Sequence, residues 1–344
     1  MSRLSNLVER RCRGGCAQMF SARRRNPHAR ARVLLRNEKS FRQVAENNRQ
    51  LACSAPPDRR AFVPDFWFNR FVLDIQKILS IDDPRLEPYR TMKMQADHHR
   101  QRIFVAEGEK VARRLLESPL AVSSVCLPEK WLADFVPLLE RRPESIPVFV
   151  AEKEQLEKLT GFSMYQGVMA VGKIPLSASV EKILTATARP HFFAAIDAVN
   201  NSENIGVLVR NAAAFGVQAL LVGETSSSPF MRRAVRSSMG TLFQLPVVEC
   251  DDLAAVVAML RSKKIYCVAA HPHGQGPTLY QANLAGDCCI IFGSEGFGLS
   301  QKVLEACDAR VAVPMKTGVD SLNVGSAAAV FFFEVARQRE LQRA

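Results

Sequence analysis

Two regions of the chain alternate short apolar segments with amphipathic segments. In the first, residues 95–175, the apolar segments are IFVAEG, SSVCLP, VFVAE and YQGVMAVGK. Between them lie segments with a helical period, such as EKVARRLLES, in which Val111, Leu115 and Leu116 share one face. Strands that alternate with helices in this way predict a small α/β domain.

The second region, residues 191–344, repeats the pattern over a greater length. Strands are predicted at FFAAIDAV, QALLVG, LPVVE, IYCVAA, CCIIFG and ARVAVP. Helices are predicted over 203–215, 229–238, 251–263 and 299–307 and from about Val324. The pattern indicates a parallel sheet with a ligand site at the carboxyl ends of its strands. Residues 176–190 are predicted to link the two domains, because the segment KIPLSASVEKILTATARP carries two prolines and a polar stretch.

The chain before residue 95 has a different character. Residues 1–60 carry 15 of the 46 Lys and Arg but only four of the 34 Asp and Glu, so most of the net charge of +12 lies there. Because this leader has little apolar periodicity, we expect it to be disordered. Residues 61–94 are predicted to form a helical or extended connector, with one helix in FWFNRFVLDIQKIL followed by the connecting segment DDPRLEPYR.

The basic leader allows three interpretations. An Arg-rich, acid-poor segment is typical of an arm that binds nucleic acid, of a mitochondrial presequence and of translation from a spurious upstream start. The remaining residues are close to electrically neutral. We expect a cytoplasmic protein, because nothing else in the chain indicates an organelle; the alternative is mitochondrial, if residues 1–60 are a presequence.

Composition excludes several classes of protein. The densest apolar run, residues 326–333, is far shorter than the ~18 residues that cross a bilayer, so no membrane span is expected. The nine cysteines are odd in number and include no CxxC pair, which argues against a disulfide framework and a zinc ribbon. Cys288 and Cys289 are predicted to be buried. HPHG at 271–274 holds two histidines without a third ligand, so no metal is predicted.

Three segments of the second region stand apart from ordinary α/β sequence. The first is AVNNSENIGVLVRNAAAFGV, in which residues 200–202 suit a helix N-cap and Gly216 suits the helix end. Arg210 falls outside the apolar stripe of this helix. Gly206, one turn earlier, has no side chain and would leave room for a ligand beside the guanidinium. The alternative is an ordinary surface arginine.

The other two segments place glycines and polar groups after strands. In CCIIFGSEGFGLS a buried strand runs into Gly293-x-x-Gly296-x-Gly298, which predicts either backbone contact with a ligand or a tight turn. The spacing is not GxGxxG, and no GxxxxGK[ST] loop occurs. In VAVPMKTGVDSLNVGSAAAV, Ser321 and Asn323 stand at the mouth of a helix, where they either cap it or bind a ligand.

Together and in this order, the three segments resemble the motifs of the SpoU/TrmH family of S-adenosylmethionine-dependent RNA ribose 2'-O-methyltransferases, part of the SPOUT superfamily. The matching stretches are NIGVLVRNAAAFG, GSEGFGLS and VPMKTGVDSLNVGSA. The resemblance covers residues 191–344 well. It extends more loosely to residues 95–175, which resemble the family's RNA substrate-binding domain. Gly325 departs from the family, in which Ser is frequent at this position.

The resemblance implies a fold, a cofactor and an assembly. The second domain would be a parallel sheet knotted as a trefoil, and two chains would form a homodimer whose active sites are completed across the interface. S-adenosylmethionine would be the cofactor, and tRNA or rRNA the substrate. The positions that match the family's cofactor site are Gly293, Gly296, Val313, Met315 and Leu322. Those that match its catalytic cluster are Asn204, Arg210, Glu295, Ser321 and Asn323.

The implied reaction methylates a ribose 2'-OH, which must lose a proton. The resemblance assigns the role of base to Arg210, but a guanidinium stays protonated at neutral pH. The alternative role for Arg210 is to clamp an RNA phosphate, which suits its bidentate fork. Further arginines allow two interpretations, contact with RNA phosphates or a solvated surface. These are Arg102, Arg232, Arg233 and Arg236.

Two other functions compete with this one. A non-catalytic RNA-binding or ribosome-assembly protein could share the fold, but it has no evident need for an intact catalytic cluster. A nucleotide-dependent oxidoreductase would fit an ordinary parallel sheet, but the GxGxxG fingerprint and its acidic ribose partner are missing.

Overall fold

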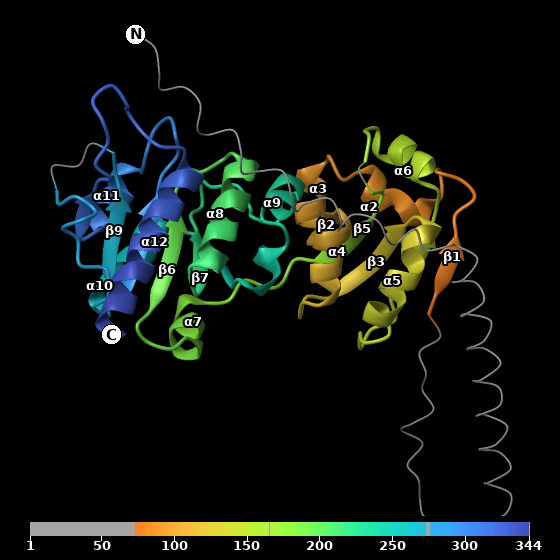
Figure 1. Ribbon diagram of the computed structural model, residues 1–344, viewed down its shortest axis with the longest axis horizontal. Coiled ribbons are helices and arrows are strands. Elements are labelled where there is room, and N and C mark those ends of the chain that lie inside the picture. The colour runs from red at the N-terminus through yellow and green to blue at the C-terminus, as the bar shows by residue number, and fades with distance from the viewer. Residues whose placement is uncertain (1–72, 165, 273–275, 344) are drawn as a thin grey trace, which may run out of the picture. The chain divides into compact units, whose positions relative to one another are not determined.

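The computed structural model describes residues 73–164, 166–272 and 276–343 (Figure 1), which contain two β-sheets. The predictions for residues 1–60, for the start of the connector and for part of the HPHG segment lie outside these residues.

The first sheet has five strands and is mixed. In sheet order they are β1 (Ile75–Lys77), β4 (Val148–Val150), β3 (Val122–Leu127), β5 (Met169–Lys173) and β2 (Ile103–Glu107). β1, β4 and β3 are parallel, and β5 runs antiparallel to β3 and β2. One face packs against α4 (Glu109–Leu116) and α5 (Glu129–Leu139). The other packs against η2 (Pro84–Leu86), α2 (Glu87–Arg90) and α6 (Lys153–Thr160), and α3 (Gln95–Arg100) contacts β2.

The first sheet includes residues from before position 95, where we predict only a connector. Residues 75–77 form an edge strand paired with β4. The prediction of a helix there is wrong, because the apolar residues of so short a segment fit either period and pairing with β4 decides between them. Tyr89 of α2 is fully buried, and its hydroxyl lies 2.8 Å from Ser124 Oγ of β3. The end of the connector is therefore part of the core.

The second sheet has six strands, all parallel, as predicted. In sheet order they are β11 (Ala309–Val311), β9 (Tyr266–Ala270), β10 (Cys288–Phe292), β6 (Phe192–Ile196), β7 (Ala219–Val222) and β8 (Val247–Glu249). In sequence order, β6 is the first strand of this sheet, and β7 and β8 follow on one side of it. The chain then crosses to the other side of β6, where it forms β9. Such a reversal opens a crevice at the carboxyl ends of the central strands.

Helices cover both faces of this sheet (Figure 1). On one face lie α8 (Ser202–Ala214) and α12 (Val324–Arg343), and on the other α7 (Val180–Ala186), α10 (Leu253–Ser262) and α11 (Gln301–Ala306). Alternate residues of β6 serve the two faces: Phe192 packs with α8 and α12, and Phe193 packs with α10. α9 (Arg232–Ser237) and the 3-10 helix η3 (Thr241–Gln244) contact α8.

Helix α7 lies within residues 176–190, which we predict to be a linker. Ser179 caps it by accepting a hydrogen bond from Lys182 N at 3.3 Å. Val180 and Ile183 are buried in the same hydrophobic cluster as Phe193. This segment therefore packs against the second sheet instead of passing freely through solvent.

The six cysteines of the described residues are buried and unpaired. Cys288 and Cys289 are among them, as predicted, and burial raises the pKa of the Cys288 thiol to about 12. A protonated thiol is a poor nucleophile and metal ligand. Within the described ranges, no group of three or more His, Cys, Asp or Glu side chains is placed to hold a metal ion. No helix in this part of the chain has the length and apolar character needed to cross a membrane.

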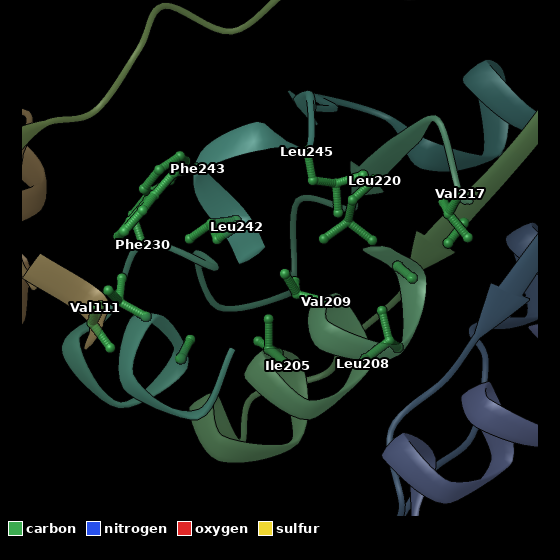
Figure 2. Packing of buried hydrophobic residues seen from close by; sticks show 14 of the residues in the cluster. Val111, Ile205, Leu208, Val209, Val217, Leu220, Phe230, Leu242, Phe243 and Leu245 are labelled. Carbon is green, nitrogen blue, oxygen red and sulfur yellow. The ribbon is translucent and has the colours of Figure 1, made fainter. Parts of the chain in front are cut away.

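The two sheets share one hydrophobic cluster. The ring of Phe104 on β2 lies 5.4 Å from the rings of Phe230 and Phe243, which precede and follow α9. Figure 2 shows Phe230 and Phe243 in the cluster that also holds Val111 of α4 and Ile205 of α8. The core therefore runs without interruption from the first sheet to the second.

Helix α8 begins and ends as the sequence predicts. Asn201 caps it by accepting hydrogen bonds at Oδ1 from two N–H groups of the first turn, at 2.9 and 3.3 Å. Gly216, just beyond the helix, takes a left-handed φ of +78°. Gly206, however, is buried against α9 and opens no space beside Arg210. The interpretation of this glycine as room for a ligand is wrong, because it serves the close approach of two helices.

We predict that Gly206→Ala destabilises the fold. The added Cβ would lie less than 3.0 Å from Ser237 Oγ and from the Ala234 carbonyl oxygen, which belongs to the backbone of α9. Forcing α8 and α9 apart is expected to cost about 1–3 kcal/mol and to lower the midpoint of thermal unfolding. Gly286→Ala is the control, because its Cβ would meet nothing within 4 Å. Equal melting temperatures for the two variants would contradict this account.

Candidate active site

A cavity of about 370 Å³ lies at the carboxyl ends of the strands of the second sheet, where the parallel topology predicts a ligand site. Its walls come from the segments that follow β9, β10 and β11 and from the segment that leads into α12. All the residues predicted to bind the cofactor line it, namely Gly293, Gly296, Val313, Met315 and Leu322.

The loop after β10 folds back on itself. Ser294 and Gly298 exchange two backbone hydrogen bonds of 3.0 Å, and Gly298 takes a left-handed φ of +70°. A Cβ at Gly293 would lie less than 3.0 Å from the backbone of Gly298 and Leu299, so only glycine fits there. The tight-turn interpretation is therefore confirmed, and the turn forms one wall of the cavity.

Three side chains, one from each motif, meet beside this cavity. Glu295 Oε1 accepts hydrogen bonds from Asn204 Nδ2 at 2.7 Å and from Asn323 Nδ2 at 2.6 Å. Asn323 Nδ2 also donates to Asn204 Oδ1 at 3.0 Å. Two amides thus hold the carboxylate. Its second oxygen, Oε2, has no hydrogen-bond partner among the residues that the structure describes.

Asn323 caps the helix, as the sequence suggests, and also takes part in the cluster around Glu295. Its Oδ1 accepts hydrogen bonds from Gly325 N at 2.9 Å and from Ser326 N at 3.4 Å, so it caps the start of α12. Its Nδ2 donates hydrogen bonds to Glu295 and Asn204. Capping and participation in the site are therefore two uses of one amide.

Arg210 stands apart from this cluster. It follows Asn204 by six residues on α8, which turns it about 240° around the helix axis and moves it about 9 Å along the axis. Its side chain is exposed, does not line the cavity, and makes no hydrogen bond or ion pair with a described residue. Ser321 does line the cavity. One chain therefore gathers the predicted catalytic residues at one site except for Arg210.

Gly325 allows α12 to pack closely on α8. A Cβ at this position would lie 2.7 Å from Cγ1 of Val207. The Gly325 carbonyl oxygen accepts a hydrogen bond from Asn211 Nδ2 at 2.9 Å. The Val207 side chain on the facing helix thus occupies the space that a Ser side chain at position 325 would need.

The arginines predicted to contact RNA differ in their surroundings. Arg232 is largely buried, with 14% of its side chain exposed, and pairs with Glu107 at the end of β2. Arg236 lies 3.4 Å from the same carboxylate. Arg102 donates to a backbone carbonyl oxygen, and Arg233 is exposed, with no ion pair in the described ranges. For Arg232 the alternative of a solvated surface residue is wrong, because its charge is compensated by Glu107 inside the fold, and its contact with RNA stays a prediction.

The cavity contains residues that our prediction omits. Asp320 stands directly before Ser321 in the third motif, so the motif itself was a signal for it. His271 also lines the cavity, although we consider its HPHG segment only as a metal site. The position of His271 depends on β9 ending beside β10, which is a property of the sheet order.

Comparison with known proteins decides the family. A model described as the SpoU rRNA methylase family matches residues 191–333. A protein of Mycobacterium tuberculosis, described as an uncharacterized tRNA/rRNA methyltransferase, is 32% identical over 273 residues, which cover 77% of this chain and 93% of that protein. The chain belongs to the SpoU rRNA methylase family. It is therefore an RNA methyltransferase, of a family whose methyl donor is S-adenosylmethionine, which solved relatives hold as AdoMet.

Other methyltransferases resemble the chain at lower identity. The 23S rRNA (guanosine-2'-O-)-methyltransferase RlmB of Escherichia coli K12 is 27% identical over 214 residues, 61% of this chain and 86% of that enzyme. A solved rRNA methyltransferase of Sinorhizobium meliloti with bound AdoMet superposes with a TM-score of 0.67 at 19% identity, over 77% of this chain and 98% of that one. AviRb of Streptomyces viridochromogenes gives 0.65 at 22% identity, over 75% and 98%. These structures share the fold.

The two amides that hold Glu295 are expected to differ in their effect on stability. Asn323→Ala removes the cap of α12 as well as a bond to Glu295, and loss of an Asn cap costs about 1 kcal/mol. We predict that Asn323→Ala lowers the free energy of unfolding by about that amount more than Asn204→Ala does. Urea unfolding measures the difference. Asn323→Ser, which still caps a helix, is the control; if it is as unstable as Asn323→Ala, the cap is not the cause.

Proposed function

We propose that this protein transfers a methyl group from S-adenosylmethionine to a ribose 2'-OH of ribosomal RNA. The observation that carries the proposal is the hydrogen-bonded cluster of Asn204, Glu295 and Asn323 beside the cavity. The family description and the reaction named for the E. coli relative support ribosomal RNA and the 2'-OH. In this proposal residues 191–344 form the methyltransferase domain, and the first sheet belongs to an RNA substrate-binding domain.

The cavity fits the proposed cofactor. Its volume of about 370 Å³ lies within the usual range for small-molecule sites. Phe292, Leu299 and Phe331 supply apolar walls of the kind that bury an aromatic base. The backbones of Gly293, Val313 and Leu322 can offer hydrogen bonds to the base edge and ribose. When bound, S-adenosylmethionine supplies a methyl group already activated on a sulfonium.

The remaining requirement is to position the ribose hydroxyl and to accept its proton or hold it in a hydrogen bond. Glu295 Oε2 is the open acceptor beside the cavity, because Oε1 is occupied by the two amides. Fixing the carboxylate in advance reduces the reorganisation needed when substrate binds. Asn204 and Asn323 thus act as positioning residues for Glu295, and Ser321, which lines the same cavity, would assist.

Arg210 would complete the site of a second chain in a homodimer. It lies on an exposed face of α8, and apolar side chains are also exposed on α8 and α12, namely Val207, Val330 and Phe333. Burying such a patch favours association. Since a guanidinium keeps its proton at neutral pH, the role that suits Arg210 is to clamp the phosphate beside the target ribose.

We also propose that the C-terminal segment forms a trefoil knot. Supporting this, the connection between β9 and β10 lies alongside the segment that follows β11: Leu279 N donates to Ala312 O at 2.8 Å. The chain then continues from this edge of the sheet to α12, whose Phe331 and Phe332 pack on Phe292 of central strand β10. A segment that passes beneath an earlier connection and returns to the centre is what a trefoil requires.

We predict that Arg210→Ala abolishes methyl transfer, with a loss of at least about 100-fold, while cofactor affinity and melting temperature stay unchanged. The residue is exposed and outside the cavity, so a selective loss would locate its role in the assembled site. Methyl transfer from labelled S-adenosylmethionine measures the effect. Arg210→Ala with wild-type activity would overturn the assignment.

Mixing two inactive variants tests completion across the dimer. In an equal mixture of Arg210→Ala and Glu295→Ala chains, half of the dimers are mixed, and each mixed dimer has one intact site of its two if the sites are shared. We expect recovery of about a quarter of wild-type activity after the chains are co-refolded or co-expressed. No recovery, with mixed dimers shown by native mass spectrometry, would place Arg210 and Glu295 in the same chain's site.

The RNA class is tested with separate pools of unmodified rRNA and tRNA. We expect a labelled 2'-O-methylnucleoside, identified by digestion and mass spectrometry, in the rRNA pool only. Arg210→Ala is the negative control for contaminating activity. Methylation confined to tRNA would overturn the proposed substrate and leave the reaction intact.

A further inference from the structure

A second cavity, of about 490 Å³, lies next to the start of α8 and apart from the cofactor cavity. It is lined by Lys93 and Gln95 at the start of α3, by residues 200–203 at the start of α8, and by Arg232 and Arg233 at the start of α9. We call it the basic cleft. It shares no lining residue with the cofactor cavity, and Lys93 was not among the predicted RNA contacts.

The cationic side chains of the basic cleft differ in whether a carboxylate of the protein already pairs with them. Arg232 is paired with Glu107 and packs with its guanidinium 4.9 Å from the ring of Phe162, so its position is fixed. Lys93 Nζ lies 5.2 Å from the same ring. Lys93 and Arg233 are exposed and form no ion pair with a described residue. Two cations in the cleft are therefore available to a ligand.

One carboxylate also lines the basic cleft. Glu203 is exposed and is the only acidic residue among the lining residues named above. With Arg232 compensated by Glu107, the available Lys93 and Arg233 outweigh Glu203 by one positive charge. An anion is the ligand that this balance favours, and Glu203 is expected to weaken its binding.

The basic cleft and the catalytic cluster both involve the start of α8. Asn201 and Ser202 line the cleft, and Asn204, two residues further along the helix, hydrogen-bonds to Glu295. Residues two apart in a helix differ by only about 3 Å along its axis. A chain of linked anionic groups could therefore have one unit at the cluster and a neighbouring unit in the cleft, and RNA is such a chain.

We propose that the basic cleft binds a phosphodiester of the RNA strand close to the methylated nucleotide, with Lys93 and Arg233 as its cationic contacts. Arg232 supports this site by its fixed position but does not itself pair with the phosphate. The inference rests on the proposed function only in taking RNA as the substrate. In this proposal Lys93 gives the domain of the first sheet a direct contact with the RNA. That contact would help to fix which nucleotide of the strand lies at the cluster.

The test compares RNA affinity as a function of KCl for the full-length wild-type protein, Lys93→Ala and Arg233→Ala. The probe is a fluorescently labelled rRNA fragment that the wild-type protein binds. Each substitution is expected to weaken binding about five- to tenfold at fixed salt and to reduce the slope of log affinity against log salt by about 0.7. Lys302→Ala on α11 removes an equal charge from an exposed position on the opposite face of the second sheet and is the matched control.

Glu203→Gln provides a result of opposite sign. Removing the carboxylate from the cleft is expected to tighten RNA binding about two- to fivefold, which a loss of folding could not do. S-adenosylmethionine affinity, measured by calorimetry, and melting temperature are expected to stay unchanged in all four variants.

The proposal is overturned if Lys93→Ala and Arg233→Ala stay within twofold of Lys302→Ala in affinity and salt slope. Its failure is distinct from failure of the proposed function. A wild-type protein that binds RNA through the cleft but methylates none would overturn the reaction and support the cleft. A wild-type protein that binds no RNA would overturn both.

Discussion

The candidate active site depends on one carboxylate. Glu295 receives hydrogen bonds at a single oxygen from two amides that lie 91 and 28 residues away along the chain. Hydrogen bonds to a charged acceptor are roughly twice as strong as neutral ones. They tie the loop after β10 to the starts of α8 and α12, and two of these three segments also form walls of the cavity. The same hydrogen bonds therefore fix both the shape of the cavity wall and the position of Glu295.

Helix α8 carries three residues of interest on different sides. Its first turn carries Asn204 to Glu295, its buried side meets α9 at Gly206, and its exposed side carries Arg210. Because the helix is rigid over this length, it holds Arg210 about 240° around its axis and about 9 Å along it from Asn204. This geometry is the reason for the proposed dimer: if Arg210 and Glu295 serve one reaction, as proposed, they are held apart within one chain and would meet between two chains.

Much of the fold could be predicted from the sequence, because it depends on local pattern. The parallel sheet, the cap at Asn201 and the bounds of α8, within one residue, all follow from periodicity and capping chemistry. The motif resemblance also collected the residues of the cavity. The strand at 75–77, the packing of Gly206 and the pairing of Arg232 could not be predicted, because each depends on a partner distant in the chain.

The ring of Phe104 bears on how proteins of this architecture can be rearranged. It fills the space between Phe230 and Phe243, so a fragment that begins at His191 would keep every strand of the second sheet and yet expose two large rings. Exposed apolar surface of that kind promotes aggregation. An exchange of the half that holds the first sheet between relatives therefore has to carry β2 together with a matching α9 region, and the residues on the two sides of this contact are constrained to change together.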